Sequence, residues 1–373
     1  MIIGIPRETA ADENRVGLPP SAVLSLVRQG HQVVVERGAG AGSGFTDDAY
    51  AGVGAQIVHG ADEVYRRAAL LVKVVAPGPA ECDLLQPEQT LVALLHLAAQ
   101  PPRLLDTLRQ GGATAIDLAT IEAADGGLPV LRPMSQIAGR IVAQLAGRYL
   151  QSDHGGRGIL LGGLPAVPPA EVVILGGGVV GRNAARAFLG CGARVTVLDT
   201  DYECLRELDW RFDGRLTTFV ATESTLPKVL KYADVVIGAV LIPGARTPHL
   251  VTRQALGLLK DRAVVFDIAI DQGGCFESSR PTRLSDPTYV VDGITHFCAP
   301  NLPSLVARTA THALGNLALP YLAALAAEPA GEALRRDAAL RRGVNVYRGR
   351  VVHERVAAAH RCPHEPLEGL LSL

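Results

Sequence analysis

A glycine-rich turn between an apolar strand and a helix is the feature that most constrains this fold. The apolar run Val172–Leu175 leads into Gly176-Gly177-Gly178-Val179-Val180-Gly181, and a helix-forming segment follows at once. In this G-x-G-x-x-G spacing, the first glycine permits a tight turn, the second lets the backbone approach a diphosphate, and the third lets helix and strand pack closely. Unpaired N–H groups at the start of the helix can bind the phosphates. The turn therefore predicts a doubly wound α/β domain that binds a dinucleotide.

A carboxylate at the end of the next predicted strand indicates which dinucleotide is bound. Arg194–Leu198 ends at Asp199, about 20 residues after the turn, where a carboxylate can accept hydrogen bonds from ribose hydroxyls. The same carboxylate would repel a 2′-phosphate, and Thr200 is not the arginine that NADP sites usually offer. The alternative is a glycine-rich turn with an incidental surface aspartate. We predict that NAD is the cofactor and that its site includes Gly176, Gly178, Gly181 and Asp199.

Short apolar runs alternate with helical segments along most of the chain. In the first third we predict five buried strands, Ile2–Ile5, Gln32–Glu36, Leu70–Val75, Thr90–Leu95 and Thr114–Leu118. A second series comprises Val172–Leu175, Arg194–Leu198, Val235–Ala239 and Val264–Ile268. Strands that alternate with helices pair in parallel, so the predicted class is α/β with two doubly wound, Rossmann-like domains. The tail from about Thr309 is too short for a core of its own, and we expect it to pack on the first domain.

Composition excludes several other classes of protein. A net charge of −1 over 373 residues gives no electrostatic reason to bind nucleic acid or an anionic membrane. No apolar run approaches the roughly 20 residues that span a bilayer, and the first residues lack the layout of a signal peptide. The six cysteines and ten histidines show no metal-ligand spacing. We therefore expect a cytoplasmic protein with reduced thiols, no metal, and no nucleic-acid or membrane partner.

Three candidate chemical groups follow predicted strands. Arg15 lies between the first strand and the first helix, where it could clamp a carboxylate, although a solvated surface arginine fits the sequence alone better. His96 follows a strand and can exchange protons near neutral pH, although a half-buried structural histidine fits equally well. Asp271 precedes two glycines, so a flexible loop could carry its carboxylate, or it could be an ordinary turn residue. Together they supply a cation, a proton carrier and a carboxylate at strand ends.

Longer segments identify the chain by resemblance. They are spread over the whole sequence and include Gly4–Glu8, Asn14–Val16, Leu95–Ala98, Pro133–Ser135, His154–Gly158, Gly238–Ala245, Asp267–Gly274 and Ser279–Thr282. On these segments the chain resembles the alanine dehydrogenase family, which is related to the NAD domain of proton-pumping transhydrogenase.

The resemblance implies a fold, a reaction and a set of site residues. The fold would be a substrate domain made of residues 1–130 and 306–373 around an NAD-binding Rossmann domain of residues 131–305, commonly assembled as a homo-oligomer, a hexamer. The reaction would be the reversible NAD-dependent deamination of L-alanine to pyruvate and ammonia. Arg15 would hold the substrate carboxylate, His96 would be the acid–base residue, and Asp271 would assist the water and the carbinolamine or imine. The NAD site would also be lined by Ser135, Asp199, Val240, Leu241 and Asn301.

Departures from the family pattern suggest an altered substrate pocket. Where the family has Val-Lys-Val-Lys-Glu-Pro, with the second lysine on the substrate, this chain has Val75. Lys73 shares that face of the strand but lies roughly 7 Å away. The family's Tyr-Glu before a threonine is Leu118-Ala119 here, and its Met-Ser-Glu ends in Gln136. Removing one charge donor typically costs on the order of 10²–10³ in rate, so we expect impaired alanine turnover.

Three functional hypotheses follow. The leading one is a diverged NAD-dependent oxidoreductase acting on a C–N bond, either an amino-acid dehydrogenase or an imine reductase, with a small amino, imino or keto acid as substrate. The second is authentic L-alanine dehydrogenase activity, with Lys73 or water replacing the missing lysine. The third is a catalytically silent NAD-binding protein, because the nucleotide motif is intact beside an eroded substrate pocket.

Overall fold

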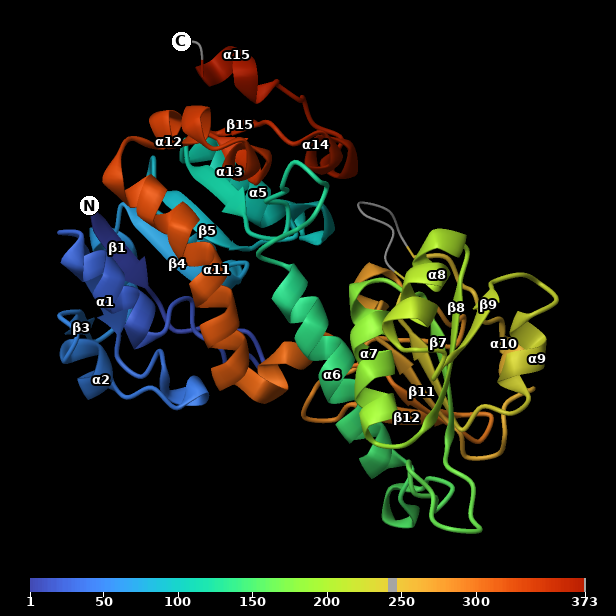
Figure 1. Cartoon of the computed structure of the whole chain (residues 1–373). Coiled ribbons are helices and arrows are strands. Elements are labelled where there is room, and N and C mark those ends of the chain that lie inside the picture. Colours follow the sequence, from blue (N-terminus) through green and yellow to red (C-terminus); the bar gives the residue numbers. More distant parts are fainter. Residues whose placement is uncertain (241–246, 372–373) are drawn as a thin grey trace. The chain divides into compact units, whose positions relative to one another are not determined.

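The computed structural model describes residues 1–240 and 247–371, which fold into two compact units. The first unit joins both parts of the chain that flank the second: residues 1–134 and the described residues from 304 onwards. The second unit is formed by the described residues of Ser135–Pro303. Each unit contains one sheet with helices packed on it (Figure 1).

Six parallel strands form most of the sheet in the first unit. They are β1 (Ile2–Ile5), β2 (Gln32–Glu36), β3 (Gln56–Val58), β4 (Leu70–Val75), β5 (Thr90–Leu94) and β6 (Thr114–Asp117), in the order β3-β2-β1-β4-β5-β6. Most of their valine, isoleucine and leucine side chains are buried, as expected for parallel strands covered on both faces. All six carboxyl ends therefore lie at one edge of the sheet, and loops leaving that edge can share a site.

Helices connect these strands and cover the sheet. In the first part of the unit they are α1 (Pro20–Arg28), α2 (Asp47–Ala51), α3 (Ala61–Arg67), α4 (Pro79–Cys82) and α5 (Pro102–Gln110). α1 and α5 each begin with proline, whose missing N–H costs nothing in the first helical turn. One face of α1 is apolar, and its Ala22, Val23 and Leu26 are buried. None of the helices that the structure describes is long and apolar enough to cross a bilayer.

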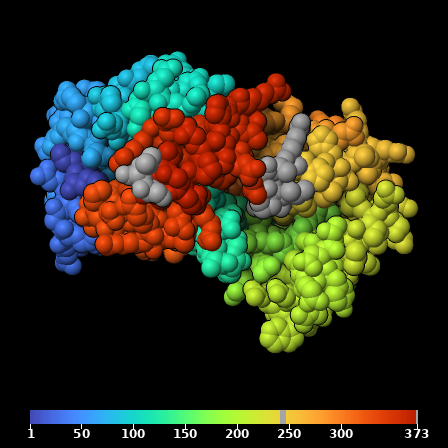
Figure 2. Space-filling model, turned by 90° about the horizontal axis from the view of Figure 1, so that it is seen from above, coloured from blue at the N-terminus to red at the C-terminus, as the bar shows by residue number. Residues whose placement is uncertain are grey.

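The C-terminal segment extends the first sheet. The long helix α11 (Ala307–Ala327) is followed by α12 (Ala330–Arg336) and α13 (Ala338–Arg342). Then β14 (Val344–Tyr347) pairs antiparallel with β6, β15 (Arg350–Val351) pairs antiparallel with β14, and α14 (Glu354–His360) and α15 (Leu367–Leu371) follow. The space-filling view shows this segment, in orange and red, on the surface of the first unit (Figure 2).

The second unit has a sheet in the order β12-β13-β11-β10-β7-β8-β9. Its strands are β7 (Glu171–Leu175), β8 (Arg194–Asp199), β9 (Thr217–Val220), β10 (Val235–Gly238), β11 (Val264–Asp267), β12 (Thr288–Val291) and β13 (Ile294–Phe297). Its helices are α6 (Arg132–Tyr149), which begins in the first unit, α7 (Val179–Gly190), α8 (Tyr202–Arg211), α9 (Leu226–Leu230) and α10 (Arg253–Leu256). The direction of the strand order reverses between β7 and β10, and ligands of doubly wound sheets bind at such a switch point.

The predicted α/β class with two doubly wound, Rossmann-like sheets is confirmed, but pairing is not parallel throughout. β12 pairs antiparallel with β13, and β14 pairs antiparallel with both of its neighbours. Two of these pairs are hairpins whose turn residues have positive φ: Asp292 and Gly293 at 50° and 80°, and Arg348 and Gly349 at 46° and 76°. Such turns reverse the chain within two residues, whereas a parallel connection needs a crossover.

A buried charge network holds β4 in the first unit. The Lys73 side chain is 0% exposed, and its Nζ lies 3.0 Å from Glu8 Oε2 and 2.8 Å from Glu81 Oε1. The hydroxyl of Tyr65 also donates to Glu81 Oε1, at 3.0 Å. Burial lowers the pKa of the Lys73 ammonium, but the two carboxylates outweigh this effect and the pKa is raised. The amino group is therefore a charged structural link among β4, α4 and the segment after β1.

We predict that Lys73→Met destabilises the protein by about 3–5 kcal/mol, because it leaves two buried carboxylates without their cation. Chemical denaturation followed by circular dichroism measures this change. The matched control is Lys228→Met, since Lys228 is exposed on α9 and its replacement should shift stability by less than about 0.5 kcal/mol. Equal stability of the two variants would contradict the structural role of Lys73.

Candidate active site

The glycine-rich turn lies after β7 and opens α7. Gly176 has a φ of 101°, in the region that favours glycine, and its N–H donates to Leu198 O at 2.8 Å. A Cβ on Gly181 would lie 1.8 Å from Gly176 O, so no larger residue fits there. Gly178 precedes the first residue of α7, is exposed, and a Cβ there would meet nothing within 4 Å. The start of α7 is therefore open to a diphosphate, as a dinucleotide site requires.

Asp199 ends β8 beside this turn. Its Oδ2 accepts a hydrogen bond from Gly177 N at 2.7 Å, and its Oδ1 accepts one from Asp201 N at 2.9 Å. The carboxylate thus holds the turn and the start of the next helix in place, and the side chain is half-buried. Each oxygen can accept a further bond, so ribose hydroxyls could bind without breaking these contacts. The turn and its carboxylate fit an unphosphorylated ribose of NAD.

Other predicted cofactor residues lie in the same unit. Val240 follows β10 and is half-buried, and its Cγ2 would lie 3.1 Å from a Cβ on Gly176. Ser135 is half-buried in α6, one turn before Gly139, where a Cβ would come within 2.3 Å of Val180 O in the first turn of α7. Asn301, in the loop after β13, has a φ of 60°, which asparagine tolerates. Leu241 lies outside the described residues.

Arg15 is buried in the first unit rather than solvated. The residue is 2% exposed, and Glu13 binds its guanidinium through two oxygens: Nε donates to Oε1 at 2.8 Å and Nη2 to Oε2 at 2.6 Å. Nη1 donates to Met134 Sδ at 3.4 Å. This pairing fixes the plane of the guanidinium, a group whose planar fork of N–H donors suits carboxylates.

The loop that carries Arg15 is held on both sides by polar contacts within the first unit. Asn14 N donates to Ser304 Oγ at 2.9 Å, and Val16 N donates to Thr311 Oγ1 at 3.2 Å. A Cβ on Gly17 would lie 2.5 Å from Val72 O, so the loop returns directly over β4. These contacts place Arg15 at the edge formed by the carboxyl ends of β1 and β4.

His96 lies at the same edge, after β5. Its side chain is exposed and its backbone is left-handed, with φ 46° and ψ 43°, just before the 3-10 turn η2 (Leu97–Ala99). Its N–H donates to Asp117 Oδ2 at 2.7 Å. Val75, at the end of β4, pairs with Leu94 of β5 and is half-buried. The structure therefore brings Arg15, Val75 and His96 to one edge of the first sheet.

Asp271 is exposed on the 3-10 turn η4 (Ile270–Gln272), directly after β11 in the second unit. Its loop is held by Asp267, the last residue of β11, which is 1% exposed. Burial raises the pKa of the Asp267 carboxyl, and hydrogen bonds to the carboxylate oppose this effect. These bonds come from Ala269 N at 3.2 Å, Cys275 N at 2.8 Å, Phe276 N at 3.3 Å and Ser279 Oγ at 2.6 Å.

Sequence reasoning missed the groups that hold the candidate residues. Glu13 stands two residues before Arg15, and Asp117 is the last residue of the strand β6. A strand-ending aspartate was the signal that identified Asp199, and it could have identified Asp117. The sequence left open whether Lys73 replaces the lysine missing at position 75. The amino group of Lys73 is buried between Glu8 and Glu81 and does not lie free at the sheet edge.

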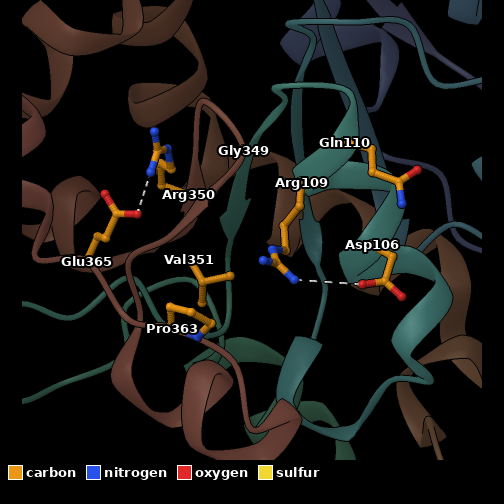
Figure 3. Close-up of a pocket in the computed structure, with 8 residues that line it drawn as sticks. All are labelled: Asp106, Arg109, Gln110, Gly349, Arg350, Val351, Pro363 and Glu365. Atoms are coloured by element: carbon orange, nitrogen blue, oxygen red, sulfur yellow. Dashed lines mark hydrogen bonds and ion pairs between the residues drawn. The ribbon is translucent and has the colours of Figure 1, made fainter.

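A separate surface pocket of about 500 Å³ is formed by the first unit between the end of α5, β15 and the segment before α15 (Figure 3). Its charged residues pair with one another: Arg350 with Glu365 at 2.7 Å and Arg109 with Asp106 at 3.9 Å. None of the predicted site residues lines this pocket. Among the described residues, no three histidine, cysteine, aspartate or glutamate side chains are grouped as metal ligands would be.

Known proteins of one family match this chain over its whole length. The family models "Alanine dehydrogenase/PNT, N-terminal domain" and "Alanine dehydrogenase/PNT, C-terminal domain" match residues 4–138 and 142–354. The alanine dehydrogenase of Mycolicibacterium smegmatis is 45% identical over 96% of both chains, and that of Methanococcus maripaludis is 43% identical over 100% of both chains.

Solved structures support the same assignment. An L-alanine dehydrogenase structure superimposes with a TM-score of 0.93 at 44% identity, covering 97% of this chain and 99% of that one. A transhydrogenase from Sinorhizobium meliloti shares the fold, with a TM-score of 0.81 at 22% identity over 95% of this chain and 99% of that one. The chain therefore belongs to the alanine dehydrogenase/PNT family and is an NAD-dependent oxidoreductase.

Proposed function

We propose that this enzyme catalyses the reversible oxidative deamination of L-alanine to pyruvate and ammonia. The observation that carries the proposal is the buried, oriented guanidinium of Arg15 at the same sheet edge as the exposed imidazole of His96. An amino acid needs both groups: a cation for its carboxylate and a proton carrier for its amino group. Relatives of 43% and 45% identity named alanine dehydrogenase favour alanine over the diverged substrate that the sequence alone suggested.

The proposed roles follow from the positions of the side chains. Arg15, with its plane fixed by Glu13, binds the substrate carboxylate through its positive charge and planar guanidinium. His96 accepts a proton at its exposed imidazole as the amino group and then water lose protons. Asp271 orients the water that adds to the imine carbon. Bound NAD⁺ supplies the hydride acceptor for the substrate Cα, and the glycine-rich turn with Asp199 holds it.

A second candidate function rests on Val75. This half-buried valine replaces the substrate-contacting lysine implied by the family resemblance, and Lys73 is tied to Glu8 and Glu81. An apolar group at this position fits a substrate that arrives as a preformed imine, because no ketone oxygen then has to be polarised. Reduction of a small imino acid by NADH is therefore the alternative reaction.

A substrate panel tests the proposed function directly. We expect the purified enzyme to reduce NAD⁺ with L-alanine, and to oxidise NADH with pyruvate plus ammonia, both followed at the absorbance of NADH. A panel of cyclic imines and of other keto acids with amines is run in parallel. Turnover of an imine without turnover of pyruvate and ammonia would reject alanine dehydrogenase activity in favour of imine reduction, and no turnover in either panel would reject both.

Arg15→Lys tests carboxylate binding without leaving Glu13 unpaired. Lysine keeps the charge but loses the planar fork, so we expect the KM for L-alanine to rise by roughly 10–150-fold, which corresponds to about 1.5–3 kcal/mol. The affinity for NAD⁺ should not change, because Arg15 is not among the residues that we propose hold NAD⁺. The control is Arg336→Lys in the same unit, whose exposed side chain pairs with Glu328. Equal KM values for the two variants would exclude Arg15 from the substrate site.

Val75→Lys distinguishes the two candidate functions. If the pocket serves alanine, a lysine here adds a charge donor, and we expect kcat/KM for L-alanine to rise by about tenfold or more, within the 10²–10³ that such a donor can supply. Val75→Met, which adds length without charge, is the control and should give no such gain. A fall in alanine turnover in Val75→Lys together with intact imine reduction in the parent enzyme would favour the second function.

A further inference from the structure

The backbone at His96 is held in an unusual conformation. Its φ of 46° and ψ of 43° place it in the left-handed region, which is uncommon for a residue with a Cβ. This conformation turns the chain sharply from the end of β5 into η2, while the imidazole stays exposed. Its direction therefore depends on whatever fixes the two peptide units around it.

The buried carboxylate of Asp117 fixes these peptide units. Its Oδ1 accepts a hydrogen bond from Leu95 N at 3.0 Å, and its Oδ2 accepts one from His96 N at 2.7 Å. Oδ1 also accepts a bond from Ala119 N at 2.9 Å. Asp117 itself is 1% exposed, so no bulk water competes for these three N–H groups. Both oxygens of the side chain therefore serve as acceptors for backbone N–H groups.

The fold places this carboxylate beside His96 and covers it. Asp117 is the last residue of β6 and pairs with Ala93 of the parallel strand β5. The loops that follow β5 and β6 therefore begin side by side at the same edge of the sheet. On its other side Asp117 N donates to Gly343 O at 2.8 Å, from the segment just before β14. His353, which follows β15, also interacts with Asp117, and burial lowers the pKa of this histidine. The C-terminal segment thus contributes to the shell around the carboxylate.

The far side of the His96 turn is held as well. His360 Nε2 lies 2.8 Å from Leu97 O, which ties α14 to η2. Ala99 N donates to His96 O at 2.8 Å, and Gln100 Nε2 donates to Leu95 O at 3.3 Å. The turn is therefore fixed from β6, from α14 and by its own hydrogen bonds, and the carboxylate of Asp117 is the group that receives the N–H of His96 itself.

We propose that Asp117 is a positioning residue for the reaction: through two backbone N–H groups it sets the direction in which His96 presents its imidazole to the substrate. The inference rests on the proposed function for its catalytic consequence. Because Asp117 is buried and acts through the main chain, it touches neither substrate nor cofactor. Its loss should therefore slow the proton-transfer steps and leave the substrate carboxylate bound by Arg15.

Asp117→Asn is the test variant. The amide keeps the size of the side chain but has one acceptor oxygen, so its NH₂ group must face one of the N–H groups that the carboxylate received. We expect kcat for L-alanine to fall at least tenfold, with the KM for L-alanine and the dissociation constant of NAD⁺ within about threefold of the parent values. Asp117→Glu, which keeps both acceptor oxygens but shifts them by one methylene, should lie between Asp117→Asn and the parent.

The control is Asp234→Asn, the same change at a buried carboxylate that also pairs with Arg157 at 3.1 Å and Lys260 at 3.0 Å. Asp234 precedes β10 in the second unit, is 4% exposed, and accepts a hydrogen bond from Glu171 N at 2.9 Å. Measured below the unfolding temperature of both variants, its kcat should stay within about twofold of the parent. Equal losses of kcat in the two asparagine variants, or a kcat for Asp117→Asn within twofold of the parent, would overturn the proposal.

Two further outcomes keep the test decisive. If Asp117→Asn does not fold, Asp117→Glu carries the test, and a parent-like kcat in that variant would overturn the proposal. If the parent enzyme has no turnover with L-alanine, the proposed function fails, and hydrogen exchange at the amides of residues 95 and 96 then tests Asp117 alone. There we expect at least tenfold faster exchange in Asp117→Asn than in Asp234→Asn, and equal rates would overturn the positioning role.

Discussion

The loops that follow the carboxyl ends of the strands contain backbone N–H groups that must find hydrogen-bond acceptors. The rest of the site depends on which groups accept these bonds. At these points the ladder of strand hydrogen bonds stops, yet the chain is still buried. Aspartates that end strands supply the acceptors: Asp117 for the turn after β5, Asp199 for the glycine-rich turn, and Asp267 for the loop after β11. A carboxylate accepts several bonds at once, so one side chain can fix a whole loop. Each of these loops carries a residue to which we assign a role in binding or catalysis.

This arrangement separates the residues that hold the loops from those that meet ligands. Asp117 and Asp267 are 1% exposed, whereas His96 and Asp271 are exposed on the turns that these aspartates hold. Arg15 differs, because it is buried and its anchor, Glu13, binds the guanidinium itself. A guanidinium that binds a carboxylate needs its plane fixed. A second carboxylate fixes that plane but also partly neutralises the positive charge. An imidazole that only exchanges protons needs a fixed main chain.

Much of the fold could be predicted because its central strands are mostly apolar. The predicted Ile2–Ile5, Gln32–Glu36 and Leu70–Val75 coincide with β1, β2 and β4, since burial on both faces favours apolar residues at successive positions. Edge strands such as β3 and β9 were missed: they have three and four residues, and β9 is largely exposed. The Asp292-Gly293 hairpin was also missed, although this dipeptide favours a two-residue turn. In the site, residue type suggested Arg15 and His96. The ion pair of Arg15 with nearby Glu13, and the contact of His96 with Asp117, which is 21 residues away, appear only in the folded chain.

Because different residues hold the loops and meet the ligands, a residue that contacts the substrate could change while the site kept its geometry. Val75 belongs to β4, whose position is set by pairing with β1 and β5 and by the buried charges around Lys73. Its side chain holds no loop, so a lysine or a valine there leaves the backbone in place. A change at Asp117 or Glu13 would instead free a buried N–H or leave a buried guanidinium unpaired, which costs more than a lost contact with a small substrate. Selection for a new substrate would therefore act first on positions such as Val75, and the carboxylates that hold the loops would be the last part of this edge to change.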